Sequence, residues 1–214
     1  MTYHQSPLTP QQLGNHIPRR GDKISQSLAQ RFLAMTGWQI TGDIPNIAQA
    51  VLLAAPHTSN IDGVFAIATW LALDLDIRIL GKKQLFFVPL LGRFLHWAGV
   101  MPIDRDKKGS VLQANINRFK QGNPLFLALA PEGTRAKTQS LKTGFYYLAV
   151  GAGVPIIPVA MDYKKRTVAF LPPFYPTGDI DTDMPKIYAY YHGVTPKHPD
   201  RLATVLKHPK HPDQ

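Results

Sequence analysis

The sequence contains no cysteine among its 214 residues. Disulfide bonds, cysteine-ligated metal sites and thiol nucleophiles are therefore excluded. Long apolar runs are also lacking, since no stretch reaches the roughly 18 residues that a membrane-spanning helix needs. The two nearest candidates are 64–73 and 85–103, which we interpret as buried or interfacial segments. The polar start of the chain lacks the apolar stretch of a signal peptide, so we expect a cytoplasmic protein.

Acidic side chains are scarce: 14 Asp and Glu stand against 24 Lys and Arg, which gives a formal net charge of +10. This balance favours anionic partners, such as a phosphate-bearing substrate, an acidic membrane surface or nucleic acid. Because the basic residues are scattered and no nucleic-acid motif is visible, we do not expect nucleic acid to be the partner. A length of 214 residues suits one domain with a sizeable core.

Five short apolar runs follow one another along the chain, and they are continuous rather than alternating. Such runs are typical of strands buried on both faces of a largely parallel sheet. Segments with helical spacing separate them. This alternation predicts a single-domain α/β fold whose largely parallel or mixed central sheet is flanked by helices. The predicted strands are 51–55, 77–80, 100–103, 125–130 and 156–160, and the predicted helices are 24–35, 64–73, 110–119 and 141–151.

The two ends of the chain depart from this pattern. Residues 1–21 are expected to form an irregular leader, and residues 22–195 carry the predicted domain. Residues 196–214 contain the segment Pro-Lys-His-Pro-Asp twice, which predicts a flexible basic tail. Within the domain, a charged turn at 164–166 predicts a hairpin over 161–171.

Candidate catalytic residues, His57 and Asp62, follow the predicted strand 51–55 through a turn rich in helix-capping residues. In open α/β sheets, functional groups gather just beyond the strand ends. The spacing lets the Asp62 carboxylate accept the proton of one imidazole nitrogen, which leaves the other free to take a proton from a substrate hydroxyl. A structural role is the alternative, because the helix dipole alone favours a carboxylate in the first turn.

Two arginines also follow predicted strands. Arg105 comes just after 100–103, and Arg135 follows 125–130 together with Gly133, which permits close backbone approach. Guanidinium groups bind phosphate in a forked geometry, so two arginines at the ends of different strands can converge on one anion.

Four ordered blocks together resemble the glycerolipid acyltransferases, the family typified by 1-acylglycerol-3-phosphate O-acyltransferase. Each block is short, and the specificity comes from the ordered set. Pro56 stands where the family commonly has asparagine and Ala130 where it has a large residue, which bears on the acceptor more than on the reaction. The blocks are His-x-x-x-x-Asp at 57–62, Gly-x-x-x-Ile-x-Arg at 99–105, Pro-Glu-Gly-Thr-Arg at 131–135 and Val-Pro-Ile-x-Pro-Val at 154–159, and 81–85 and 141–144 are similar to connecting elements of the family.

The resemblance implies an O-acyltransferase of phospholipid biosynthesis. His57 would act as general base and Asp62 would orient it, so that the acceptor hydroxyl attacks the acyl thioester directly, without a metal or a cofactor. The donor would be acyl-CoA or acyl carrier protein, and the acceptor a lysophospholipid such as 1-acylglycerol-3-phosphate. Backbone N–H groups around Gly133 are candidates to stabilise the developing oxyanion. Substrate binding is assigned to Lys82, Arg105, Glu132, Gly133, Thr134, Arg135 and, for the acyl or donor pocket, Pro155.

The transmembrane anchors of many family members have no counterpart in this sequence. We therefore expect peripheral attachment to the inner face of the cytoplasmic membrane, through basic charge and apolar helices. Residues 86–97 are the candidate lipid-facing or acyl-chain surface, and an ordinary packed helix is the alternative.

Three rival functions are weighed against acyl transfer. A lipid or thioester hydrolase would use Ser59, but the sequence has no Gly-x-Ser-x-Gly elbow and Ser59 is better explained as a helix cap. A metal hydrolase is disfavoured because His57 has no His-x-x-x-His partner. A non-catalytic module that binds anionic membranes is compatible with the net charge.

Overall fold

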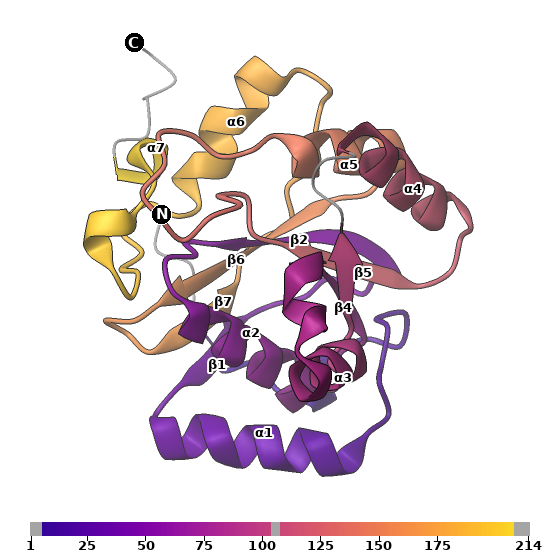
Figure 1. Cartoon of the computed structure of the whole chain (residues 1–214), viewed down its shortest axis with the longest axis vertical. Coiled ribbons are helices and arrows are strands. Elements are labelled where there is room, and N and C mark those ends of the chain that lie inside the picture. Colours follow the sequence, from indigo (N-terminus) through magenta and orange to yellow (C-terminus); the bar gives the residue numbers. More distant parts are fainter. Residues whose placement is uncertain (1–5, 104–107, 208–214) are drawn as a thin grey trace.

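The computed structural model describes residues 6–103 and 108–207. Its strands form one seven-stranded sheet in the order β1-β7-β6-β2-β5-β3-β4 (Figure 1). The five strands from β6 to β4 are parallel, whereas β7 is antiparallel to β6 and β1 is parallel to β7. The predicted α/β fold with a largely parallel sheet is therefore confirmed. The strands are β1 Gln39–Gly42, β2 Gln49–Ala55, β3 Ile77–Lys82, β4 Val100–Ile103, β5 Leu125–Leu129, β6 Ile156–Asp162 and β7 Thr167–Phe170.

Helices cover both faces of this sheet, with α1 and α2 on one side and α4, α5 and α6 on the other (Figure 1). No helix among the described residues is long and apolar enough to cross a membrane. The α-helices are α1 Lys23–Thr36, α2 Asn60–Ala72, α3 Pro89–Trp97, α4 Lys108–Lys120, α5 Gly144–Ala152, α6 Ile180–Ala189 and α7 Thr204–Lys207, and the short 3-10 helices are η1 Pro10–Gln12, η2 Lys83–Phe87 and η4 Pro199–Arg201.

Strand β2 lies at the centre of the sheet, and its side chains enter two separate cores in alternation. Ala50 and Leu52 pack with the α1 and α2 side, whereas Val51 and Leu53 pack with the α4, α5 and α6 side. All four side chains have no exposed surface, which explains why the strand sequence is apolar without interruption. A rigid central strand therefore leads directly into the turn that carries His57.

The predicted helix 24–35 is present as α1, and the chemistry of its ends explains its bounds. The Asp22 side chain accepts hydrogen bonds from the N–H groups of Ile24 and Ser25, and Gly37 ends the helix with a φ of 71°. The hairpin predicted over 161–171 is also present as β6 and β7. Among the elements that were not predicted are β1, which has only four residues, and α6, which contains Pro185.

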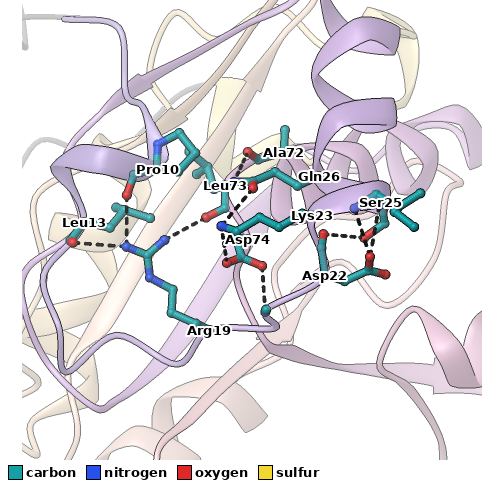
Figure 2. Close-up of polar contacts among 12 residues, drawn as sticks. Pro10, Leu13, Arg19, Asp22, Lys23, Ser25, Gln26, Ala72, Leu73 and Asp74 are labelled. Atoms are coloured by element: carbon teal, nitrogen blue, oxygen red, sulfur yellow. Dashed lines mark hydrogen bonds and ion pairs between the residues drawn. The ribbon is translucent and has the colours of Figure 1, made fainter.

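The described part of the leader, from residue 6 onward, contains the short helix η1 and is attached to the domain (Figure 2). The Arg19 guanidinium donates to the Leu73 carbonyl at 3.2 Å and to two carbonyls of the leader itself. Asp74 is buried, accepts from the Gly21 N–H at 2.8 Å and lies 3.7 Å from the Lys23 ammonium. These contacts fix the leader to the end of α2, and its apolar side chains enter the core: Leu8, Leu13 and Ile17.

The expectation of a flexible tail does not hold as far as Lys207. Ala203 and Leu206 are buried in the core beside α6, because the short helix α7 turns Leu206 inward and Ala203 directly precedes it. The His198 N–H also donates to Thr58 Oγ1 at 3.1 Å, in the turn after β2. The repeated segment misled the prediction: its first copy runs into η4, and its second copy lies outside the described residues.

Candidate active site

Polar side chains gather where three neighbouring parallel strands end. His57 follows β2, Glu132 follows β5 and Tyr163 follows β6. Because β2 lies between β5 and β6 in the sheet, these three residues emerge side by side at the same edge. Ligand-binding groups in open α/β sheets lie at this edge.

The turn between β2 and α2 holds the Asp62 carboxylate in place. Ser59 is the N-cap of α2, and its hydroxyl accepts from the Ile61 N–H at 3.3 Å. One carboxylate oxygen of Asp62 accepts in return from the N–H groups of Thr58 and Ser59, each at 2.8 Å. The predicted capping role of Ser59 is confirmed, and this reciprocal capping also fixes the position of Asp62.

His57 and Asp62 are brought together, as their spacing predicted. The distance from His57 Nδ1 to Asp62 Oδ2 is 3.6 Å, which is longer than a hydrogen bond but within electrostatic reach. Burial lowers the pKa of His57, the Asp62 charge opposes this effect, and the Arg135 cation adds to it. The imidazole is therefore neutral at physiological pH, which is the form that can accept a proton.

Glu132, which was expected to hold the acceptor head group, is instead buried behind the His57 loop. Its Oε1 atom accepts from the His57 N–H at 2.9 Å. None of the described residues donates to its Oε2 atom. Burial raises the pKa of Glu132 to about 7. The side chain therefore supports the backbone of His57 and does not line the cavity.

A cavity of about 720 Å³ opens beside His57 and Asp62, and its walls are mostly apolar. This volume lies in the range of ligand-binding pockets. Side chains of α2, α3, α4, α5 and β6 contribute to the walls, among them Ile67, Trp70, Leu95, Leu112, Leu148 and Met161. The cavity thus combines a polar corner, at His57 and Asp62, with space for an apolar chain.

The segment after β5 supplies cationic groups to this polar corner. Gly133, Thr134 and Arg135 line the cavity, as does Lys142. Gly133 has a φ of +63°, and a Cβ atom there would lie 2.6 Å from the Lys142 ammonium. Glycine therefore permits the lysine to approach the backbone closely. The buried Nε of Arg135 has no hydrogen-bond partner in the described ranges.

The structure does not bring Pro155 to the site. Its carbonyl accepts from the Val51 N–H at 3.0 Å, at the opposite end of β2 from His57. Six residues of strand separate the two ends by roughly 20 Å, at about 3.3 Å per residue. Val159 and Met161 of β6, the strand that follows Pro155, line the cavity in its place.

Two further assigned residues are Lys82 and Arg105. Lys82 is the last residue of β3, which ends at the same edge as β2. Arg105 lies outside the described residues. Within those residues, no group of three His, Asp or Glu side chains is arranged to hold a metal ion.

Tyr163 was missed by the sequence analysis. Its hydroxyl donates to Asp62 Oδ1 at 2.6 Å, on the carboxylate oxygen that the backbone N–H groups leave open. The usable signal was its position three residues after the end of the predicted strand 156–160, at the edge where functional groups gather. Lys142 had appeared only within the connecting element 141–144.

Several known proteins are similar in sequence to this chain. The 1-acyl-sn-glycerol-3-phosphate acyltransferase of Salmonella typhimurium is 34% identical over 132 residues, which are 59% of this chain and 52% of that protein. The enzyme of the same name from Escherichia coli is 36% identical over 95 residues, 41% of this chain and 38% of that protein. The chain thus spans about half the length of the first of these relatives.

A solved structure has the same fold. The crystal structure of the 1-acyl-sn-glycerophosphate (LPA) acyltransferase from Thermotoga maritima matches with a TM-score of 0.53 at 20% identity, over 73% of this chain and 69% of that chain. The model of a protein family described as Acyltransferase matches residues 38–162, a region that contains both His57 and Arg135. Since this region makes up more than half of the chain, the protein belongs to the acyltransferase family, as the four ordered blocks predicted.

Proposed function

We propose that this chain is an O-acyltransferase that moves a fatty acyl group from a thioester to the hydroxyl of a lysophospholipid of the 1-acylglycerol-3-phosphate type. The observation that carries the proposal is the position of His57 and Asp62 on the wall of an apolar cavity that also contains Arg135. The names of the two bacterial relatives support the same acceptor. The donor is acyl-CoA or acyl carrier protein.

The chemistry is a single displacement with His57 as general base. The neutral imidazole takes the proton of the acceptor hydroxyl while the hydroxyl oxygen attacks the thioester carbonyl. The new ester C–O bond forms, the C–S bond breaks, and the proton passes from the imidazolium to the departing thiolate. Asp62, facing Nδ1 at 3.6 Å, stabilises the imidazolium while it exists. General base catalysis of this kind contributes about 10²–10⁴-fold.

The cations of the polar corner suit the phosphate of the acceptor. Arg135 and Lys142 line the cavity from the segment that follows β5, beside Thr134. A guanidinium group binds phosphate through two parallel hydrogen bonds, and an ammonium group adds a point charge. The Gly133 N–H itself donates to the Ala130 carbonyl at 3.3 Å, so the candidate donors to the thioester oxygen, as negative charge develops on it, are other backbone N–H groups around Gly133.

The proposal includes peripheral attachment to the inner face of the cytoplasmic membrane, and the exposed apolar surface around α3 supports membrane attachment. Leu90 is 80% exposed and Phe87 70% exposed, with Phe94 and Trp97 also at the surface. Leu95 of the same helix lines the cavity, so the helix lies between the surface and the acyl-chain space. The Arg20 guanidinium lies 4.4 Å above the Trp97 ring and adds a cation suited to anionic lipid.

The test of the proposed function is a free-thiol release assay. The purified chain is given acyl-CoA or acyl carrier protein thioester, together with a panel of hydroxyl acceptors, and the lipid products are identified by mass. We expect thiol release that requires a lysophosphatidate-type acceptor and a product heavier by one acyl group. His57→Ala is expected to abolish transfer while the far-ultraviolet circular dichroism spectrum stays unchanged.

Two outcomes would replace the proposal with a rival. Thiol release that is independent of any acceptor would indicate a thioester hydrolase. Binding to anionic vesicles without thiol release under any acceptor would indicate a non-catalytic membrane module. Turnover of His57→Ala at the wild-type rate would overturn the assigned base even if transfer occurs.

A further inference from the structure

We propose that Tyr163 is a positioning residue for the proposed acyl transfer, because its hydroxyl locks the Asp62 carboxylate in the orientation that faces the His57 imidazole. This inference rests on the proposed function for its kinetic part. Tyr163 lies 101 residues beyond Asp62 in the chain and is outside the four ordered blocks.

The Asp62 carboxylate is held on both of its oxygens. Oδ2 accepts from the N–H groups of Thr58 and Ser59 and is the atom that faces His57 Nδ1. Oδ1 accepts from the Tyr163 hydroxyl at 2.6 Å, a short, charge-assisted hydrogen bond. With both oxygens bonded and the side chain only 1% exposed, the carboxylate cannot rotate away from the imidazole without breaking bonds.

The Tyr163 ring is itself fixed by aromatic neighbours. It contacts the Trp38 ring edge-on, with centroids 4.9 Å apart, and the Phe65 ring at 6.3 Å. Trp38 and Phe65 stack on each other at 4.2 Å, so that the three rings form one cluster that includes the helix carrying Asp62. Edge-to-face pairs of this kind add to the packing energy and restrict the ring orientation.

The backbone of Tyr163 is tied to the segment that follows α6. Its N–H donates to the Thr195 carbonyl at 2.8 Å, and the Lys197 ammonium lies 5.5 Å above its ring. The same segment reaches the turn after β2, where the His198 N–H donates to Thr58 Oγ1. One segment therefore supports both sides of the Asp62 carboxylate, through Tyr163 and through Thr58.

The hydroxyl acts only as a donor at this position. Burial, the hydrogen bond to Asp62 and the Asp62 charge together raise the pKa of Tyr163. Tyr163 therefore stays protonated and shares the negative charge of the carboxylate. Without this donor, more of that charge would act on His57, whose pKa would rise. The other charged groups that bear on this pair are Glu132 and Arg135, on the segment after β5, and Lys197 above the ring.

The test compares Tyr163→Phe with Tyr146→Phe as a matched control. Tyr146 also donates to a buried carboxylate, at 2.9 Å from Asp183, but lies in the core formed by α5 and α6. We expect Tyr163→Phe to lower kcat about 10-fold, a part of the general base contribution, with the KM values of donor and acceptor unchanged. The acidic limb of the pH–rate profile should move to higher pH, by about half a unit. Tyr146→Phe should change neither quantity.

Two further measurements separate this role from a structural one and from the proposed function. In a double-mutant cycle, Tyr163→Phe should cost far less in an Asp62→Asn background, because the two residues act as one unit. The His57 imidazole is titrated by NMR, its signal assigned from His57→Gln, and its pKa should rise in Tyr163→Phe whether or not transfer is detected. An unmoved His57 titration, or a kcat loss equal to that of Tyr146→Phe, would overturn the positioning role. Absence of transfer in the wild type would overturn the proposed function alone.

Discussion

Glu132 occupies a position in which a carboxylate is costly. It is 4% exposed, and only one of its oxygens is bonded by a described residue, the N–H of His57. Burial is the main reason that its pKa is raised from 4.5 to about 7. A buried group of this kind stays protonated in the folded chain under conditions in which it would ionise in the unfolded chain. The contribution of Glu132 to the stability of the fold therefore depends on pH.

Replacing Glu132 with glutamine should reveal this dependence. The raised pKa means that the folded protein binds the proton more tightly than the unfolded chain, so its stabilisation is complete below about pH 4.5 and is lost as the pH rises through about 7. The wild type should lose about 3 kcal/mol of unfolding free energy relative to Glu132→Gln over this range. Urea denaturation between pH 5 and 8.5 measures the difference. The exposed Asp43→Asn variant controls for the change in charge, and a pH-independent difference for Glu132→Gln would refute the argument.

Among the secondary-structure elements, α3 has one face on the cavity and another at the surface. Leu95 contributes to the cavity wall, whereas Leu90 and Phe94 are exposed. A helix of a soluble protein normally turns its apolar residues toward the core. Apolar side chains on both faces of α3 therefore indicate that its outer face contacts a second apolar environment, such as the membrane surface proposed above. The stripe on α1 is similar, with Ile24 76% exposed, Leu28 60% exposed and Met35 85% exposed.

The double variant Leu90→Gln with Phe94→Gln should weaken binding to anionic vesicles by about 10-fold or more, since each buried apolar side chain contributes roughly 1.5–3 kcal/mol. Vesicle co-sedimentation at low and high salt measures the loss, and the remaining electrostatic part should disappear at high salt. Tyr175→Gln is the control, because Tyr175 is also exposed but does not belong to α3. It follows Phe174, which pairs with Ile156 at the start of β6, at the edge of the sheet opposite to His57. Equal loss in both variants would argue against a specific role of α3.

The elements differ in how far they could be predicted, and the reason is the range of the contacts that define them. Strands such as β2 are buried on both faces, so their apolar runs are visible in the sequence. The pairing of His57 with Asp62 is local, because the capping of one turn creates it. The bond from Tyr163 to Asp62 joins residues 101 positions apart, and no local pattern encodes it. Pro155 shows the opposite case: it lies just before the start of β6, away from the site, whereas Val159 of the same family block lines the cavity.

At the scale of the whole molecule, both described ends of the chain are part of the domain. Arg19 and Asp74 connect the leader to the end of α2. The segment from Thr195 to Lys207 contacts Thr58 in the turn after β2. It also places Leu206 in the core on the α4, α5 and α6 side of the sheet. The turn that carries His57 is therefore supported from a part of the sequence that carries none of the family blocks.

Leu206→Ala tests whether this terminal segment stabilises the whole fold. The side chain is 2% exposed, and truncation of a buried leucine leaves a cavity that costs about 2–5 kcal/mol. Chemical denaturation should show this loss with a single transition, because the segment shares its core with α5 and α6. Met35→Ala is the matched control, since it truncates a side chain that is 85% exposed and should change stability by less than about 0.5 kcal/mol. If Leu206→Ala instead unfolds at the wild-type denaturant concentration, the segment is attached without contributing to the core, and its contacts with Thr58 and Tyr163 alone would have to hold it in place.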